Sequence, residues 1–497
     1  MKSYGRATIV GMLWSWLASA GTELLWLPTA MITARLLTPA DFGITATASF
    51  FLQLAARLTQ FGFNAALVKM KEVDDDHASS VFVLNIGMGV FAWLSLALSA
   101  PWIAAFFRSP ATGEILPIAA LSFLVVPLGT VPNALLVREL RYRELTYCLW
   151  INTLTSSTVT ILLAWAGFGY WSLIYGQLAA AIAQSAAKLV YSGWRPRLRF
   201  SRSAARDTFS FGMGIYALRL LEYAALNLDS MAVGRTMGMT TLGFYDKAFN
   251  LMSRVLDRLN QAGPSISFRV FAMIQDEQER FRRGYRKIIL SSTLLSYPLM
   301  TGLALTAAPL FEVMFGKRWV IAAWPFQILC IAGGLKVLNS YAEAVVEAAG
   351  RVWAEVWRQA IYAALIVVGV VALTPWGTPG AATAVLFATI VMTGLMHHLV
   401  LRGTSLTVRD LLAPQVPAVL GSIGVAAAVL AVQCGLNRVT PGSPALVRLV
   451  AASAGGGVFY VAYVLLTPAT AVRELRQELL EDVWPAVKQM ISRPTIQ

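Results

Sequence analysis

The sequence is poor in charge: only 13% of its 497 residues are Asp, Glu, Lys or Arg. A soluble globular domain carries about 25% of these residues. The composition therefore excludes an ordinary soluble protein. The formal net charge of +14 could suggest nucleic-acid binding. The basic residues, however, lie in short connections between apolar segments, which is typical of a protein that faces an anionic membrane surface.

Cysteine and histidine are scarce, with three residues of each. Cys148, Cys330 and Cys434 lie far apart, and no Cys-x-x-Cys or Cys/His ligand spacing occurs. We therefore expect neither a disulfide framework nor a metal site. The P-loop, HExxH and GxSxG motifs are absent as well, so nothing indicates ATP hydrolysis within this chain. We expect no cofactor and no enzymatic activity.

Long apolar runs fill the rest of the chain, which is 57% hydrophobic with a mean hydropathy of +0.62. About 20 mostly apolar residues are needed for one helical crossing of a bilayer. The sequence predicts an all-α polytopic membrane protein with about 14 transmembrane helices: 8–34, 42–66, 79–106, 114–136, 146–166, 170–190, 208–234, 242–264, 288–314, 322–346, 354–374, 379–400, 411–433 and 445–466.

The basic residues set the expected orientation. Lys2 and Arg6 precede an apolar run that has no small-residue cleavage site, so we interpret this run as a retained first span. With the N-terminus in the cytoplasm and spans alternating, most of the 40 Lys and Arg residues fall in cytoplasmic connections. Because basic residues favour cytoplasmic loops, we expect a multi-pass protein of a bacterial inner membrane with both termini cytoplasmic.

A weak internal repeat indicates two halves. Met31 to Gly43 matches Met231 to Gly243, and an apolar run ending at Pro101 matches one ending at Pro309. Halves that both begin inside form parallel repeats, and transporters of this kind bind substrate between them. We expect an N-lobe of spans 1–6 (1–191), a basic cytoplasmic linker (192–207), a C-lobe of spans 7–12 (208–402), spans 13–14 (403–466) and a cytoplasmic amphipathic tail (467–497).

Charged residues occur at helical spacing inside two membrane-length segments. Segment 208–234 carries Arg219, Glu222 and Asp229, and segment 242–264 carries Lys247, Arg254, Asp257 and Arg258. A charge at mid-bilayer costs about 2.5–3.5 kcal/mol on insertion scales, so such residues usually face a bundle interior or a water-filled cavity.

Five cations within spans are candidates for binding an anionic substrate: Arg57, Arg219, Arg254, Arg258 and Lys336. The planar fork of arginine offers paired donors to phosphate. The alternative is local ion pairing, with Arg219 bound to Glu222 and Arg254 bound to Asp257 at i, i+3 spacing.

Four carboxylates within spans are candidates for carrying a coupling proton or sodium ion: Glu23, Glu222, Asp229 and Asp257. A buried carboxylate takes up a proton more readily than an exposed one. The alternative, which we favour at this point, is that each is the counter-ion of a neighbouring arginine.

Several stretches resemble one known family. They are "ARLLTPADFGITATASFF", "MAVGRTMGMTTLGFYDKAFNL", "DEQERFRRGYRKIIL", "APLFEVMFGKRWVIAAWPFQIL" and "AAGRVWAEVW". The chain resembles the polysaccharide transporter branch of the multidrug/oligosaccharidyl-lipid/polysaccharide (MOP) exporter superfamily. This resemblance implies two six-helix lobes with two accessory C-terminal helices. It also implies export of lipid-linked oligosaccharide, whose undecaprenyl pyrophosphate group the cations would hold.

The sequence therefore predicts a flippase for lipid-linked oligosaccharide that works by alternating access. Its product would be a surface polysaccharide: O-antigen of lipopolysaccharide, capsule or exopolysaccharide. Its partners would be membrane lipids and the polymerase and glycosyltransferases of the same pathway, and no nucleic acid. A lipid II flippase and a cation-coupled drug exporter remain alternatives. A membrane glycosyltransferase or polymerase fits less well, because every predicted loop is short.

Overall fold

We describe the protein from a computed structural model, which covers residues 2–59, 75–196, 223, 227–261, 263–349, 352–478 and 481. This part of the chain is built from helices and contains no strand. An all-helical build follows from the apolar sequence, because a backbone in hydrocarbon must satisfy its hydrogen bonds within its own segment. The all-α expectation is therefore confirmed for the described residues.

The chain separates into two compact units. Unit 1 comprises Met1–Asp246 with Met314–Gly316, and unit 2 comprises Lys247–Val313 with Lys317–Gln497. The labelled helices of unit 1 are α1 (Lys2–Leu36), α2 (Pro39–Thr59), α4 (Asp75–Phe107), α5 (Pro110–Ala119), α6 (Ser122–Val125), η1 (Val126–Gly129), α7 (Thr130–Arg138), α8 (Tyr142–Trp165) and α9 (Trp171–Ser192). Residues 227–237 form a further helix.

Helix α12 (Met239–Asn260) begins in unit 1 and ends in unit 2. The helices that follow it are α13 (Gly263–Met273), α14 (Gln278–Leu305), α15 (Ala307–Phe315), η2 (Lys317–Ala322), α16 (Ala323–Ala348), α17 (Val352–Ala372), η3 (Thr374–Trp376), α18 (Gly377–Gly403), α19 (Val408–Leu412), η4 (Ala413–Gln415), α20 (Val416–Val439), α21 (Ala445–Leu466) and α22 (Thr470–Glu478).

Nine helices of the described residues are long and apolar enough to cross a membrane. They are 76–107, 110–138, 142–165, 171–192, 278–305, 317–348, 374–403, 408–439 and 445–466. Helices α1, α2 and α12 also coincide with predicted segments but are not among these nine, and α17 contributes a shorter apolar helix, Trp357–Ala372. The exact number of spans, fourteen, stays a prediction.

Proline breaks the predicted span 114–136. In its place stand α5, α6, η1 and α7 in succession; Pro127, which cannot donate a backbone hydrogen bond, lies in η1. The carbonyl of Val125 instead accepts from the Ser185 hydroxyl of α9 at 3.2 Å, and the carbonyl of Pro117 accepts from Trp93 Nε1 at 3.2 Å. By contrast, α1 continues past Pro28.

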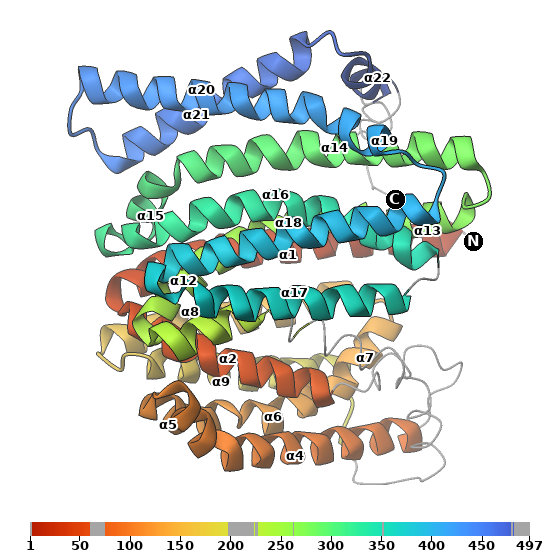
Figure 1. The fold of residues 1–497 in the computed structure, drawn as a ribbon. Coiled ribbons are helices and arrows are strands. Elements are labelled where there is room, and N and C mark those ends of the chain that lie inside the picture. Colours follow the sequence, from red (N-terminus) through yellow and green to blue (C-terminus); the bar gives the residue numbers. More distant parts are fainter. Residues whose placement is uncertain are drawn as a thin grey trace. The chain divides into compact units, whose positions relative to one another are not determined.

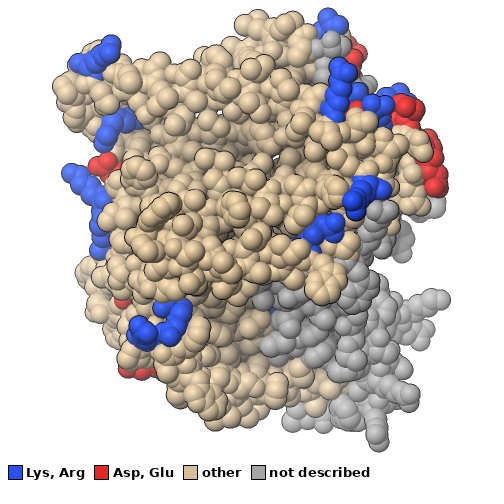
Figure 2. Space-filling view, viewed as in Figure 1, with Lys and Arg blue, Asp and Glu red and all other residues tan. Residues whose placement is uncertain are grey.

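Each unit has its own packed interior. In unit 1, α8 lies between α1 and α9, and a second cluster gathers around Ile115 and Leu116 of α5. In unit 2, α16 is the most enclosed helix and packs on α13, α14 and α18, while α14 also carries the hairpin of α20 and α21 (Figure 1). On the face drawn in Figure 2, charged side chains gather near helix ends, and the middle stretches of the helices expose uncharged side chains.

The hairpin of α20 and α21 is tied to α14 by polar contacts. Gln433 Nε2 donates to the carbonyl of Leu305 at 3.0 Å, and the Tyr460 hydroxyl donates to the carbonyl of Leu294. The Tyr297 hydroxyl of α14 donates to Gln415 Oε1 at 2.8 Å. These contacts attach the two predicted accessory helices to one helix of unit 2.

Candidate functional site

The predicted site residues are distributed over both units. Arg219 and Glu222 lie outside the described residues. Unit 1 holds Glu23 on α1, Arg57 on α2 and Asp229 in the helix 227–237, whereas unit 2 holds Arg254, Asp257 and Arg258 on α12 and Lys336 on α16. Whether these residues converge on one cavity stays a prediction.

Arg57 lies against an aromatic ring in unit 1. Its guanidinium carbon is 4.7 Å from the centre of the Tyr223 ring. Tyr223 is held there by its hydroxyl, which donates to the carbonyl of Phe50 at 3.2 Å, and by stacking on the Phe50 ring. Arg57 makes no ion pair with a described residue, and its side chain is exposed. A guanidinium stacked by its face keeps its in-plane N–H donors available for an anion.

Lys336 has a similar environment in unit 2. Its ammonium lies 5.3 Å from the centre of the Phe249 ring of α12. The same two helices are joined where Asn260 Nδ2 donates to Ser340 Oγ at 3.0 Å. Lys336 is half-buried and forms no ion pair with any residue in the described ranges. Each unit therefore contains one of the predicted site cations resting on an aromatic ring without an ion pair to a described carboxylate, although Arg143 and Arg235 of unit 1 also lie on aromatic rings.

Helix α12 is amphipathic. Tyr245, Ala248 and Met252 are fully buried and form its packed face. Arg254 and Arg258 lie on the opposite side of the helix at 100° per residue, where Arg258 is exposed and Arg254 half-buried. The charged stripe predicted from the sequence therefore lies on the side of α12 opposite its buried face. In a membrane, such a stripe requires water, protein or a polar ligand beside it.

The carboxylates differ in their surroundings. Asp229 is 1% exposed and accepts from the Tyr245 hydroxyl at 2.7 Å and from the backbone N–H of Ser230 at 2.8 Å. Asp257 is exposed and forms no ion pair with a described residue, although Arg254 and Arg258 are near enough to interact with it electrostatically. The close Arg254–Asp257 ion pair of the alternative interpretation is therefore not formed.

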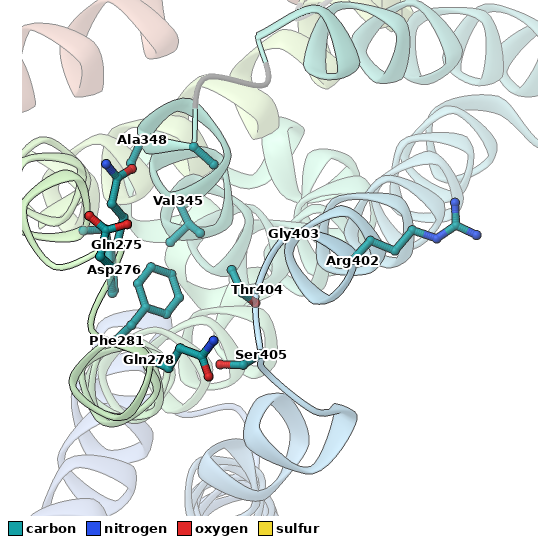
Figure 3. A pocket seen from close by; sticks show the side chains of 12 residues that line it. Gln275, Asp276, Gln278, Phe281, Val345, Ala348, Arg402, Gly403, Thr404 and Ser405 are labelled. Atoms are coloured by element: carbon teal, nitrogen blue, oxygen red, sulfur yellow. The ribbon is translucent and has the colours of Figure 1, made fainter.

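A pocket of about 570 Å³ lies at one end of unit 2, and none of the predicted site residues lines it. Phe281 and Val345 face its interior, Gln278 and Ser405 approach each other at its edge, and the side chain of Arg402 points away (Figure 3). Its remaining polar lining is neutral or acidic, so this pocket does not suit a phosphate group.

Sequence patterns did not identify the aromatic partners of the cations. Tyr223 and Phe249 belong to no recognisable motif, and no spacing connects them with Arg57 or Lys336. Both contacts join segments that are distant in the sequence, so only the fold brings them together. Chemically, the two cations offer charge-assisted hydrogen bonds to an anionic group, with the rings holding each cation in place.

Comparison with known proteins gives a consistent picture. The profile of a family described as "Polysaccharide biosynthesis protein" matches residues 32–323, which agrees with the resemblance seen in the sequence. The lipopolysaccharide biosynthesis protein WzxC of Escherichia coli (strain K12) is 24% identical over 69% of this chain and 70% of its own length. The succinoglycan biosynthesis transport protein ExoT of Rhizobium meliloti (strain 1021) is 29% identical over 65% of each chain.

The fold is also similar to a solved structure. The lipid II flippase MurJ in an inward closed conformation aligns with a TM-score of 0.71, over 91% of this chain and 98% of that chain. The two sequences are 12% identical, so this likeness concerns the fold alone.

Proposed function

Because the chain belongs to the polysaccharide biosynthesis protein family, we propose that it is a flippase that moves lipid-linked oligosaccharide across a bacterial inner membrane. The cargo is a repeat unit of a surface polysaccharide, such as O-antigen, capsule or exopolysaccharide. The names of the two relatives, one for lipopolysaccharide biosynthesis and one for succinoglycan transport, support this assignment. The protein acts as a transporter and not as an enzyme.

The proposed architecture has fourteen spans. Two six-helix lobes, 1–191 and 208–402, are related by a parallel repeat, and two accessory helices follow at 403–466. Both termini lie in the cytoplasm. The matching positions of the sequence repeat and the positions of the basic residues support this arrangement.

In the proposed mechanism, a cationic cavity is exposed alternately to the cytoplasm and the periplasm. Arg57 and Lys336 bind the pyrophosphate of the carrier lipid, together with Arg219, Arg254 and Arg258. The polyprenyl tail stays in the bilayer while the sugars pass through the cavity. Asp229, Asp257, Glu23 and Glu222 are the candidates for coupling the cycle to an ion gradient.

One observation carries the assignment of the anion-binding residues. Arg57 and Lys336 each lie on an aromatic ring, and neither has a carboxylate partner in the described part of the chain. A cation in a membrane segment without a counter-ion is costly unless a ligand or water neutralises it. A lipid pyrophosphate supplies the missing negative charge.

The test is complementation of a deletion strain of the host bacterium, read as surface polysaccharide and as lipid-linked oligosaccharide left inside the cell. Arg57→Gln and Lys336→Gln should each lower surface display roughly tenfold or more, since a charge-assisted hydrogen bond contributes about 1.5–3 kcal/mol. Arg438→Gln is the matched control, because Arg438 is an exposed cation at the end of α20. Normal display by both variants, at normal protein abundance, would remove Arg57 and Lys336 from the site.

The same strain separates the rival functions. A sole lipid II flippase could not be deleted without loss of viability, whereas a flippase for surface polysaccharide can. A drug exporter would change the resistance of the cell to cationic compounds and leave its surface polysaccharide intact. A glycosyltransferase or polymerase would change the sugar composition or chain length of the lipid-linked product.

A further inference from the structure

A second cavity lies in unit 1, apart from the residues assigned to transport. It has a volume of about 270 Å³, is lined by residues of α1, α7, α8 and α9, and combines a largely apolar lining with several polar groups. Its polar lining consists of one cation and neutral hydrogen-bonding groups: Ser15, Asn133, Tyr142, Thr146, Gln184 and Lys188. Among the described residues, no carboxylate lines it.

Of the described residues that line this cavity, Lys188 alone is charged. It is half-buried on α9, and its ammonium has no hydrogen bond or ion pair with the residues that the structure describes. The side-chain amides of Asn133 and Gln184 are likewise without a hydrogen-bond partner there. An ammonium that is removed from water and left uncompensated is destabilising. One ammonium and two amides, all able to donate hydrogen bonds, thus line one cavity in which no described carboxylate neutralises the positive charge.

The local fold fixes the position of this lysine. Gly129 ends η1, and a Cβ added there would lie 3.1 Å from Ser185 Cα and 3.2 Å from Lys188 Cδ. The missing side chain lets α9 approach the broken helix and seats the methylene stem of Lys188 against Gly129. The ammonium is thereby directed along α9 to the cavity rather than to solvent.

Two acidic residues close in sequence to the α8 lining are engaged by an arginine. Glu144, on the same helix as Tyr142 and Thr146, pairs with Arg141, whose Nε lies 3.3 Å from Glu144 Oε1. Glu139 also pairs with Arg141 at 3.3 Å. These two carboxylates are engaged outside the cavity, which leaves its interior positive.

The mouth of the cavity is partly apolar. Leu149 of α8 lines it and is 45% exposed, and Ser15 of α1 beside it is exposed as well. A cavity that combines one cation and hydrogen-bonding groups with an apolar lining exposed at Leu149 fits a ligand that has an anionic head and a hydrocarbon tail.

We propose that the Lys188 cavity binds the phosphate group of a lipid. Lys188 holds the charge, Asn133, Gln184 and Tyr142 donate hydrogen bonds to the phosphate oxygens, and the acyl or prenyl chain leaves past Leu149. In the orientation of the proposed function, on which this placement rests, the cavity lies at the cytoplasmic end of unit 1. It would there receive the phosphate of the carrier lipid before transport, or that of an anionic phospholipid.

The experiment compares phosphate-bearing lipids with their uncharged alcohols. Full-length protein in detergent is titrated with undecaprenyl pyrophosphate against undecaprenol, and with phosphatidylglycerol against diacylglycerol, and Tm is recorded. At least one phosphate-bearing lipid should raise Tm more than its alcohol does. Lys188→Gln should weaken that binding about tenfold or more, because a charge-assisted hydrogen bond is lost, and Lys188→Arg should retain it. Arg195→Gln, an exposed charge beyond the end of the same helix, is the matched control.

The phosphate-bearing lipid that raises Tm more than its alcohol does identifies the source of the phosphate. Equal binding by wild type and Lys188→Gln, or no difference between phosphate-bearing lipid and alcohol, overturns the proposal. Stabilisation by inorganic pyrophosphate alone overturns the lipid assignment. If Lys188→Gln fails to fold, Gln184→Leu tests the same site with the charge kept and should weaken binding severalfold. Because this readout needs no transport, its failure leaves the complementation test of Arg57 and Lys336 unaffected.

Discussion

Gly43 and Gly243, which occupy matching positions of the sequence repeat, pack directly against each other's helices. A Cβ added to Gly43 would lie 1.9 Å from the carbonyl oxygen of Met239, and one added to Gly243 would lie 1.8 Å from the carbonyl oxygen of Pro39. The first turns of α2 and α12 therefore meet backbone to backbone. Small residues permit this kind of close crossing between membrane helices.

The first prediction follows from this crossing. Gly43→Ala and Gly243→Ala should each destabilise the protein by about 1–3 kcal/mol, the usual effect of overpacking, because the obstructing atoms belong to backbone and cannot rotate away. Thermal unfolding in detergent measures the effect. Gly87→Ala of α4 is the control, since a Cβ there meets nothing within 4 Å and alanine favours a helix. Equal Tm values for Gly43→Ala and Gly87→Ala would contradict the close crossing.

The second prediction concerns the ring beneath Arg57. Tyr223→Phe keeps the ring and loses only the hydrogen bond to the Phe50 carbonyl, so transport should remain near the wild-type level. Tyr223→Ala removes the cation–π contact, which contributes about 0.5–2 kcal/mol, and should lower surface polysaccharide several-fold. Complementation with matched protein levels distinguishes the two. Equal loss of transport in both variants would show that the hydroxyl, and not the ring, positions Arg57.

The third prediction concerns the junction between α18 and the hairpin. Asp410 is 2% exposed, accepts from Arg282 Nε at 2.8 Å, and closes a capping box with Thr407 at the start of α19. Asp410→Asn should destabilise the protein by about 1–3 kcal/mol, because it weakens hydrogen bonds to a charged group. Arg282 is partly exposed, which keeps the expected effect below that of a buried ion pair.

Thermal unfolding and amide hydrogen exchange of α19 and the first turns of α20 check this third prediction. Exchange should accelerate there and remain unchanged in α8. Asp276→Asn, which alters an exposed carboxylate, is the control. Unchanged protection of α19 in Asp410→Asn would mean that the capping box contributes little to the junction.

The sequence predicted the helices well because apolar runs of membrane length leave the backbone little choice but helix. Helix α12 ends at Asn260, within a few residues of the predicted end of span 242–264, and α13 begins at Gly263. The sequence did not reveal that α1 tolerates Pro28, whereas the segment around Pro127 divides into several pieces. Where the segment around Pro127 divides, the Ser185 hydroxyl of α9 donates to the carbonyl of Val125, a contact between helices that the sequence does not reveal.

The candidate site was predictable only in part. Charge at helical spacing indicated the stripe on α12, and its position opposite the buried face agrees with that pattern. The aromatic rings beneath Arg57 and Lys336 and the cavity at Lys188 were not foreseen, because each depends on contacts between helices that are far apart in the sequence. The meeting of all five cations in one cavity stays a prediction.

The hydrogen bonds that Gln433 and Tyr460 donate to backbone carbonyls of α14 have a practical consequence. In hydrocarbon no water is present to replace such contacts, so the hairpin of α20 and α21 should follow α14 as one rigid body. A spin label or fluorophore attached to the solvent-facing turn between these two helices would therefore report the orientation of α14. Such a probe would report conformational changes during transport without altering any charged residue of the proposed pathway.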